Sequence, residues 1–221
     1  MRPARAAFAA NWVLTHRLLR WGGGPIAARG LAEVGRPRFL TTVVRLPPDL
    51  GVRLTEAAAQ VVEQQPEHYV YPPESVHMTI LALAGGPGVE EGVRAVANRQ
   101  GAFAVEVGGL NVSRHTVFAE IYPEDRGLAS LRRELGSAVG ASAPRWARRP
   151  RGLAHANVVR FTRPIDSRLL ARVGELRRAR FGRFTVTEVE LVHADKVLSL
   201  AGTRSLGRFR LGGEAPTGAS G

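Results

Sequence analysis

The sequence contains no cysteine among its 221 residues. This absence excludes disulfide bonds, thiolate nucleophiles and zinc sites built from cysteine. No stretch of about 18 apolar residues occurs, and the N-terminus lacks the uninterrupted apolar run of a secretory signal. The histidines show neither H-x-H nor H-E-x-x-H spacing, so we expect no metal site. These absences favour a cytoplasmic protein that has no membrane span and needs no cofactor.

Acidic residues and lysine are scarce beside arginine. The formal charge of +12 comes from 31 basic and 19 acidic residues, and Lys196 is the only lysine. Such a surplus favours anionic partners such as nucleic acid or phosphorylated metabolites, although a general bias toward arginine is an alternative explanation. The arginines are concentrated between residues 145 and 183, where only Asp166 and Glu175 oppose them. The positive charge therefore belongs mainly to the second half of the chain.

The length and the 44% hydrophobic content fit one compact domain, or two small lobes that share one core. Residues 1–37 are predicted to be a helical extension, because apolar residues recur at helical spacing from Phe8 to Trp21. Docking on the body is the preferred interpretation, and a basic amphipathic helix on a membrane or partner protein is the alternative. Residues 38–211 form the predicted body, and the small-residue tail 212–221 is expected to be disordered.

The body consists of two halves with the same order of elements: strand, helix, strand with a histidine, helix, strand. This order predicts an internal duplication and an α+β fold. We expect two lobes, each with an antiparallel sheet flanked by helices, which meet at a cleft on a pseudo-two-fold axis in a monomer. The expected strands are 39–46, 75–83, 102–110, 116–122, 153–159, 184–192 and 206–211, and the expected helices are 50–62, 89–96, 128–139 and 165–176.

Two short strands carry the residues that suggest chemistry. Side chains alternate along a strand, so His77 and Thr79 share one face, and His155 and Asn157 repeat the arrangement 78 residues later (155 − 77). Two imidazoles with an ordinary pKa of about 6.5 can act as general base and general acid. A hydroxyl and an amide beside them can donate hydrogen bonds to phosphate oxygens. The pattern therefore suits hydrolysis of a phosphodiester.

These paired stretches resemble the two-histidine (2H) phosphoesterase superfamily, which includes RNA 2′,3′-cyclic phosphodiesterases and the enzymes called 2′-5′ RNA ligases. The motif His-Met-Thr-Ile at 77–80 and the approach Tyr-Pro-Pro-Glu-Ser at 71–75 carry the resemblance, which extends over about residues 38–211. It implies a bilobal α+β fold and metal-free catalysis by His77 and His155. Asn157 departs from the family's threonine or serine. Arg160 stands where members often carry a basic residue, but strict alternation would turn it away from His155 unless the strand has a bulge.

Further candidates surround the two motifs. Tyr71 could stack on a base or simply pack in the core, and Arg151, in a basic loop before His155, could contact phosphate or remain solvated. The first hypothesis is a phosphodiesterase that opens a 2′,3′-cyclic phosphate on RNA ends or small nucleotides, with 2′-5′ RNA ligase activity as an additional option. His77 and His155 would be the acid-base pair, with either in either role. The alternative is a non-catalytic module that binds RNA or nucleotides in the same cleft.

Overall fold

The computed structural model describes residues 3–20, 39–83, 85–139, 153–195 and 197–212. Helices and strands alternate along the chain, and the strands pair antiparallel, so the predicted α+β class is confirmed. The predicted disordered tail lies, except for Gly212, outside the described residues.

The elements are α1 (Pro3–Arg20), β1 (Phe39–Arg45), α2 (Pro48–Val61), β2 (Tyr69–Val70), η2 (Pro73–Ser75), β3 (His77–Leu83), α3 (Val89–Arg99), β4 (Phe103–Val112), β5 (Thr116–Pro123), α4 (Gly127–Ala138), β6 (Ala154–Arg160), α5 (Ser167–Glu175), η4 (Leu176–Arg178), β7 (Gly182–Val186), β8 (Glu188–Ala194) and β9 (Thr203–Arg210).

The strands form one continuous sheet where two separate sheets were expected. Its nine strands follow the order β7-β4-β5-β6-β3-β1-β8-β9, with β2 paired to β6. The two halves meet where β3 pairs with β6, through Met78 opposite Ala156. The two expected sheets are therefore two halves of a single sheet that is joined at this seam.

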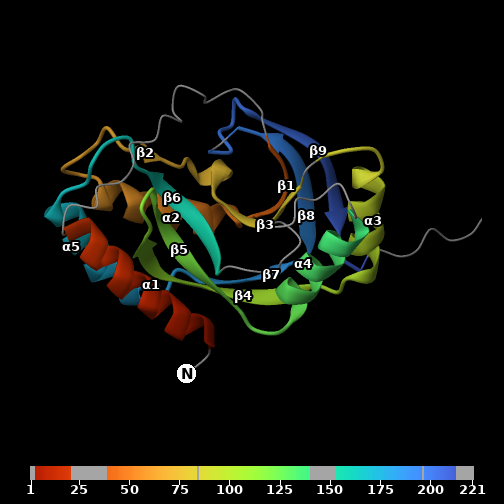
Figure 1. The fold of residues 1–221 in the computed structure, drawn as a ribbon, viewed down its shortest axis with the longest axis horizontal. Helices are drawn as coiled ribbons and strands as arrows, with labels where there is room; N and C mark the ends of the chain where they lie inside the picture. The colour runs from red at the N-terminus through yellow and green to blue at the C-terminus, as the bar shows by residue number, and fades with distance from the viewer. Residues whose placement is uncertain (1–2, 21–38, 84, 140–152, 196, 213–221) are drawn as a thin grey trace, which may run out of the picture.

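The predicted strand 184–192 is two strands that belong to opposite halves of the sheet. β7 pairs with β4, whereas β8 pairs with β1 and β9. Only Thr187 separates β7 from β8, so the sheet must curl until its β7 edge comes close to β8. Figure 1 shows this curl, with β7 running directly into β8. Alternation within a short segment cannot reveal such a change of partner.

Helices cover the two halves of the sheet (Figure 1). Helices α3 and α4 pack on each other and against β3, β8 and β9, and helices α2 and α5 pack on β6 and β4. The apolar stripes of these helices face the main core; in α2 the stripe is formed by Leu50, Leu54, Ala57, Ala58 and Val61, all buried. Burial of such a stripe stabilises the packing by about 25 cal/mol per Å² of apolar surface. Among the described residues, no helix is long and apolar enough to cross a membrane.

Helix α1 packs on β4 and β5, and its Trp12 and Leu19 also pack against the main core. Along β5 the side chains of Phe118 and Tyr122 alternate with those of Ala119 and Ile121, which belong to the main core. Phe118 and Tyr122 instead form a separate apolar cluster with Phe8 of α1. The N-terminal helix therefore covers the second face of this half of the sheet.

Gly109 lets the turn of η4 approach β4 closely. A Cβ atom at this position would lie 2.1 Å from the carbonyl oxygen of Arg177. The close approach also places the Arg177 guanidinium on the buried carboxylate of Glu120, to which it is ion-paired. Because residue 109 has no side chain, η4 can approach β4 closely enough for Arg177 to pair with Glu120 of β5.

Replacement of Gly109 by alanine is expected to lower the free energy of unfolding by about 1–3 kcal/mol or more, because backbone atoms must move to admit the methyl group. Urea denaturation at neutral pH measures the change. The matched control is Gly101→Ala, since a Cβ there meets nothing within 4 Å. Equal midpoints for the two variants would contradict the close approach of η4 and β4.

Candidate active site

His77 begins β3 and lies at the seam between the two halves of the sheet. Its side chain is 3% exposed, and its Nδ1–H donates a hydrogen bond of 2.7 Å to the carbonyl oxygen of Ser75. A carbonyl can only accept, so this bond places the proton of the neutral imidazole on Nδ1. The Nε2 atom is then left as the basic nitrogen. The short helix η2 and its Pro72–Pro73 approach hold Ser75 in place.

His155 is held in the same way on β6. Its Nδ1–H donates to the carbonyl oxygen of Leu153 over 3.1 Å, again the residue two positions earlier. The His155 side chain is exposed, in contrast to that of His77. Both imidazoles therefore present Nε2 as the basic nitrogen.

The pairing of β3 with β6 brings the two motifs together. Met78 lies opposite Ala156, and both are fully buried on the core face of the sheet. One residue further along the antiparallel register, His77 lies beside Asn157 on one side, and Thr79 beside His155 on the other. The predicted pair of histidines and their two partners thus share one face around a local pseudo-two-fold axis.

Tyr71 lies between the two motifs. Its side chain is 1% exposed, its ring centroid lies 6.4 Å from that of His77, and the Asn157 amide is close enough to the hydroxyl group to lower its pKa. Burial has the larger effect and raises the pKa of Tyr71 far above its usual value, so the hydroxyl stays protonated. The ring packs inside the protein, and the hydroxyl lies near Asn157.

Strand β6 contains the bulge that a role for Arg160 requires. Phe118 of β5 pairs with Asn157, but the preceding Val117 pairs with Val159, so β6 carries one extra residue at this point. An extra residue reverses the alternation that follows it. Arg160 is accordingly close enough to Tyr71 for its charge to lower the pKa of that hydroxyl. The structure thus places Arg160 on the side of the sheet that carries Asn157.

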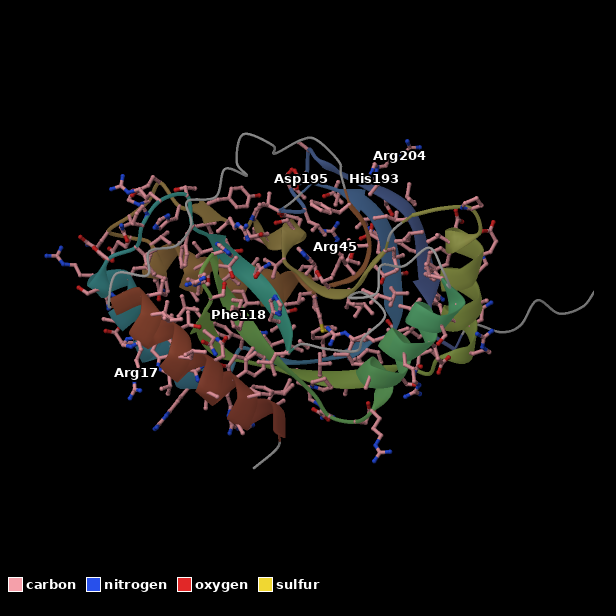
Figure 2. The ribbon with its side chains drawn as sticks, viewed as in Figure 1. Arg17, Arg45, Phe118, His193, Asp195 and Arg204 are labelled. Carbon is pink, nitrogen blue, oxygen red and sulfur yellow. The ribbon has the colours of Figure 1, made fainter. Side chains whose placement is uncertain are left out.

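Arg45 is a site residue that the sequence did not indicate. It lies directly opposite His77 in the pairing of β1 with β3 and is ion-paired with the buried Glu190 over 2.9 Å. Its guanidinium also donates to the carbonyl oxygen of Glu74. In Figure 2 Arg45 lies beside β1 and β3, on the inner side of the curl. A cation is therefore held next to His77 by a strand that precedes it in the chain and pairs with it in the sheet.

Arg132 is a second such residue, on α4. Its guanidinium donates hydrogen bonds to the carbonyl oxygens of Ile80 and Thr79, at 3.0 and 3.1 Å. Its positive charge reaches His155, whose pKa it lowers. Helix α4 thus contributes a cation at the seam, which helical periodicity alone did not reveal.

Desolvation and neighbouring cations lower the pKa of both imidazoles. The pKa of His77 falls to about 4, mainly because the ring is desolvated and also because of the charges of Arg45 and His155, against the Ser75 hydrogen bond that raises it. Desolvation also lowers the pKa of His155, against the Leu153 hydrogen bond that raises it, and the charge of Arg132 lowers it further. At neutral pH the His77 ring therefore offers a lone pair on Nε2.

A cavity of about 490 Å³ opens beside the His77 segment. Its wall combines apolar side chains with the guanidinium groups of Arg45 and Arg208. The lining residues are Arg45, Leu46, Pro48, Val52, Pro73, Glu74, Leu200 and Arg208. The size and the mixed lining are suited to a small organic group that carries negative charge.

One predicted contact lies beyond what the structure describes. Arg151 and the basic loop around it fall in the segment 140–152, outside the described residues. Within the described ranges, no three histidine, aspartate or glutamate side chains gather closely enough to hold a metal ion. The described site therefore consists of two imidazoles, a hydroxyl, an amide and the cations Arg45, Arg132 and Arg160.

Solved structures share this architecture. No protein-family model and no curated protein matches the chain. The chain matches TT0787 of Thermus thermophilus with 21% identity and a TM-score of 0.61, over 80% of this chain and 100% of that one. It matches Escherichia coli LigT complexed with 3′-AMP with 18% identity and a TM-score of 0.53, over 80% and 99%. A phosphoesterase matches with 19% identity and a TM-score of 0.51, also over 80% and 99%.

At these identities the likeness establishes the fold. The chain has the α+β fold of LigT and of that phosphoesterase, with a curled antiparallel sheet and helices outside it. The α+β fold expected from the resemblance to 2H phosphoesterases is therefore confirmed, with one curled sheet in place of the two that were expected.

The low pKa of His77 predicts a pH dependence of stability. Between pH 6.5 and about 4 the unfolded chain binds a proton that folded His77 does not, so the free energy of unfolding falls as the pH is lowered through this window. The contribution of His77 is about 3 kcal/mol in total. Urea denaturation of the wild type and of His77→Asn at about pH 7 and about pH 4.5 measures it. The variant is expected to lose less stability than the wild type, and parallel losses would contradict the shift.

Proposed function

We propose that this protein is a metal-independent phosphodiesterase that opens a 2′,3′-cyclic phosphate on RNA ends or small nucleotides. The observation that carries the proposal is the matched pair of imidazoles at the seam. Each ring has its Nδ1 proton bound to a backbone carbonyl and its Nε2 free, and the register places each beside a hydrogen-bond donor of the other motif. Two oriented bases around one axis suit a displacement in which water enters on one side of phosphorus and an oxygen leaves on the other.

We assign the general base to His77 and the general acid to His155. Burial and the adjacent Arg45 keep His77 unprotonated, so its Nε2 can take a proton from the attacking water. His155 is exposed and can be protonated beside the anionic substrate, and it then gives that proton to the departing ribose oxygen. The P–O bond to water forms as the ring P–O bond breaks, and the product is a phosphate monoester. Each histidine then contributes about 10²–10⁴ in rate.

The groups around the histidines suit the charge that develops on phosphorus. The Thr79 hydroxyl and the Asn157 amide are the donors for the non-bridging oxygens, and Arg45, Arg132 and Arg160 supply positive charge. Hydrogen bonds in which one partner is charged are about twice as strong as neutral ones. A structure of LigT with 3′-AMP shares the fold, which supports a nucleotide as the substrate class. RNA recognition, a cytoplasmic location, a monomeric state and ligase activity remain predictions.

One observation favours the alternative of a binding module without catalysis. The Asn157 amide lies near the hydroxyl of the buried Tyr71, whose pKa it lowers, so the two groups interact within the fold. A donor engaged in the fold has less capacity for a phosphate oxygen than a free hydroxyl has. In this alternative the same cleft would bind the nucleotide and leave it intact.

Incubation with a short RNA that ends in a 2′,3′-cyclic phosphate, with EDTA present, is expected to yield a 2′- or 3′-monophosphate. The variants His77→Ala and His155→Ala are each expected to lose about 10²–10⁴ of kcat, because each removes one proton-transfer group. Product analysis by chromatography measures both results.

The control for this experiment is His193→Ala, which removes an exposed histidine of β8, a strand separated from β6 by β3 and β1 in the order of the sheet. Its rate should equal that of the wild type. Binding of the RNA without turnover by the wild type would refute the enzyme and support the binding module.

Replacement of Asn157 by threonine is expected to raise kcat several-fold. The threonine hydroxyl can rotate toward a phosphate oxygen, whereas the amide of Asn157 cannot rotate in this way and interacts with Tyr71. Steady-state kinetics with a 2′,3′-cyclic mononucleotide measures the change. The matched control is Tyr71→Phe in the wild-type background, which releases the amide without changing residue 157 and should raise kcat in the same direction. A lower kcat in Asn157→Thr would indicate that the amide is the better donor in this site.

A further inference from the structure

Helix α1 lies on the same face of the sheet as the two histidines. Glu120 of β5 is the register partner of His155, and Phe118 is the partner of Asn157, so these four side chains share a face. Phe118 and Tyr122 on that face pack against Phe8 of α1. The helix therefore covers β5, the strand that pairs with β6 and its His155.

A row of aromatic contacts connects α1 to His155. The ring centroids of Phe8 and Phe118 are 6.1 Å apart, and those of Phe118 and His155 are 5.1 Å apart, with the latter rings tilted by 58°. Both distances lie within the usual range for interacting aromatic rings. Phe8 is 1% exposed and Phe118 6%. Figure 2 shows Phe118 between α1 and β6. The ring on which the imidazole rests is thus backed by the helix.

The same cluster supports the other contact of His155. Leu153, whose carbonyl oxygen accepts the Nδ1–H of His155, packs against the cluster of Phe8, Phe118 and Tyr122. Ala4 of α1 packs there as well. Helix α1 therefore supports both the ring beside the imidazole and the segment that fixes its tautomer.

Polar contacts fix the position of Phe8 on the sheet. The Asn111 amide donates to the carbonyl oxygen of Phe8 over 3.1 Å, and Asn11 donates to the carbonyl oxygen of Val112, also over 3.1 Å. Arg5 is ion-paired with Glu106 over 3.0 Å. Directional bonds spread along the helix leave it little freedom to slide.

His155 needs such support more than His77 does. The core encloses the His77 ring, which is 3% exposed, whereas the His155 side chain is exposed at the surface of the sheet. An exposed imidazole held by one hydrogen bond of 3.1 Å can rotate unless a neighbouring group restrains it. We propose that α1 is a positioning element of the active site, which holds the His155 imidazole in its productive orientation through Phe8 and Phe118. The effect of α1 on kcat rests on the proposed function, whereas its effect on the orientation of His155 does not.

Helix α1 precedes the predicted duplicated body, and it supplies a support that the two repeats do not provide for themselves. The support acts on one histidine of the pair only.

The test uses Phe8→Ala and the milder Phe8→Leu in the full-length protein. With a 2′,3′-cyclic mononucleotide as substrate, Phe8→Ala is expected to lower kcat about 10- to 100-fold, because small misplacements of a catalytic group reduce rates by such factors. The KM should change less than about two-fold, since the phosphate-binding groups stay in place. Phe8→Leu keeps much of the apolar volume and should recover most of the rate.

A second measurement is independent of turnover. In ¹⁵N NMR spectra of the imidazoles, Phe8→Ala should shift the Nδ1 and Nε2 signals of His155 toward a mixture of tautomers and leave those of His77 unchanged. Unchanged His155 signals would overturn the inference whatever the activity. If the wild type shows no turnover, the proposed function fails, and the NMR result alone then decides on the positioning role.

Two controls separate positioning from general destabilisation. Leu14→Ala removes an α1 side chain that is 63% exposed, and it should change neither kcat nor the His155 signals. Phe209→Ala removes a phenylalanine that is 4% exposed on β9, at the far edge of the sheet. It should lower stability as Phe8→Ala does and leave kcat intact. An equal loss of kcat in Phe209→Ala would refute a specific role for α1.

Discussion

The site depends on the pairing of β3 with β6 at Met78 and Ala156. An antiparallel pair has a local two-fold axis perpendicular to the sheet, so two similar strands that pair in this way set their side chains symmetrically around it. Two strands pair with the edge of β6 that faces away from β5. Ala156 pairs with β3, and Val159 and Arg160 pair with β2. The strands β3 and β6 therefore stay together for a short distance only. This brief contact places both motifs on one face and lets the two halves of the sheet diverge beyond it.

The backbone itself orients both imidazoles. In each motif the Nδ1 proton is bound by the carbonyl of the residue two positions earlier, Ser75 in one case and Leu153 in the other. Any residue supplies a carbonyl, so this orientation does not depend on the side chain that precedes the histidine. The same hydrogen bond can therefore form in two halves of a chain that share little sequence identity.

The sequence predicted features that follow from local alternation and order, and it missed those that depend on pairing between distant segments. His77 with Thr79 and His155 with Asn157 share faces because they lie two residues apart in strands. The bulge required for Arg160 is present in β6. In contrast, Arg45 reaches His77 only because β1 pairs with β3, and Arg132 reaches the seam only because α4 packs on β3. The change of sheet partner at Thr187 and the single continuous sheet are equally non-local.

The two halves differ most in how they cover the face that carries the site. On the His77 side, Val43 lies opposite Thr79 and packs with Val192, Ala194 and Leu198. Asp195, just after β8, accepts hydrogen bonds from the backbone N–H groups of Val197 and Ser199. On the His155 side, the cover is the helix α1, which precedes the two predicted repeats. One imidazole is buried by its own half, and the other is exposed and rests on a phenylalanine that the helix supports. A buried ring that stays neutral suits a base, and an exposed ring that solvent can reprotonate suits an acid, so the asymmetric cover fits the different roles that we propose for the two histidines.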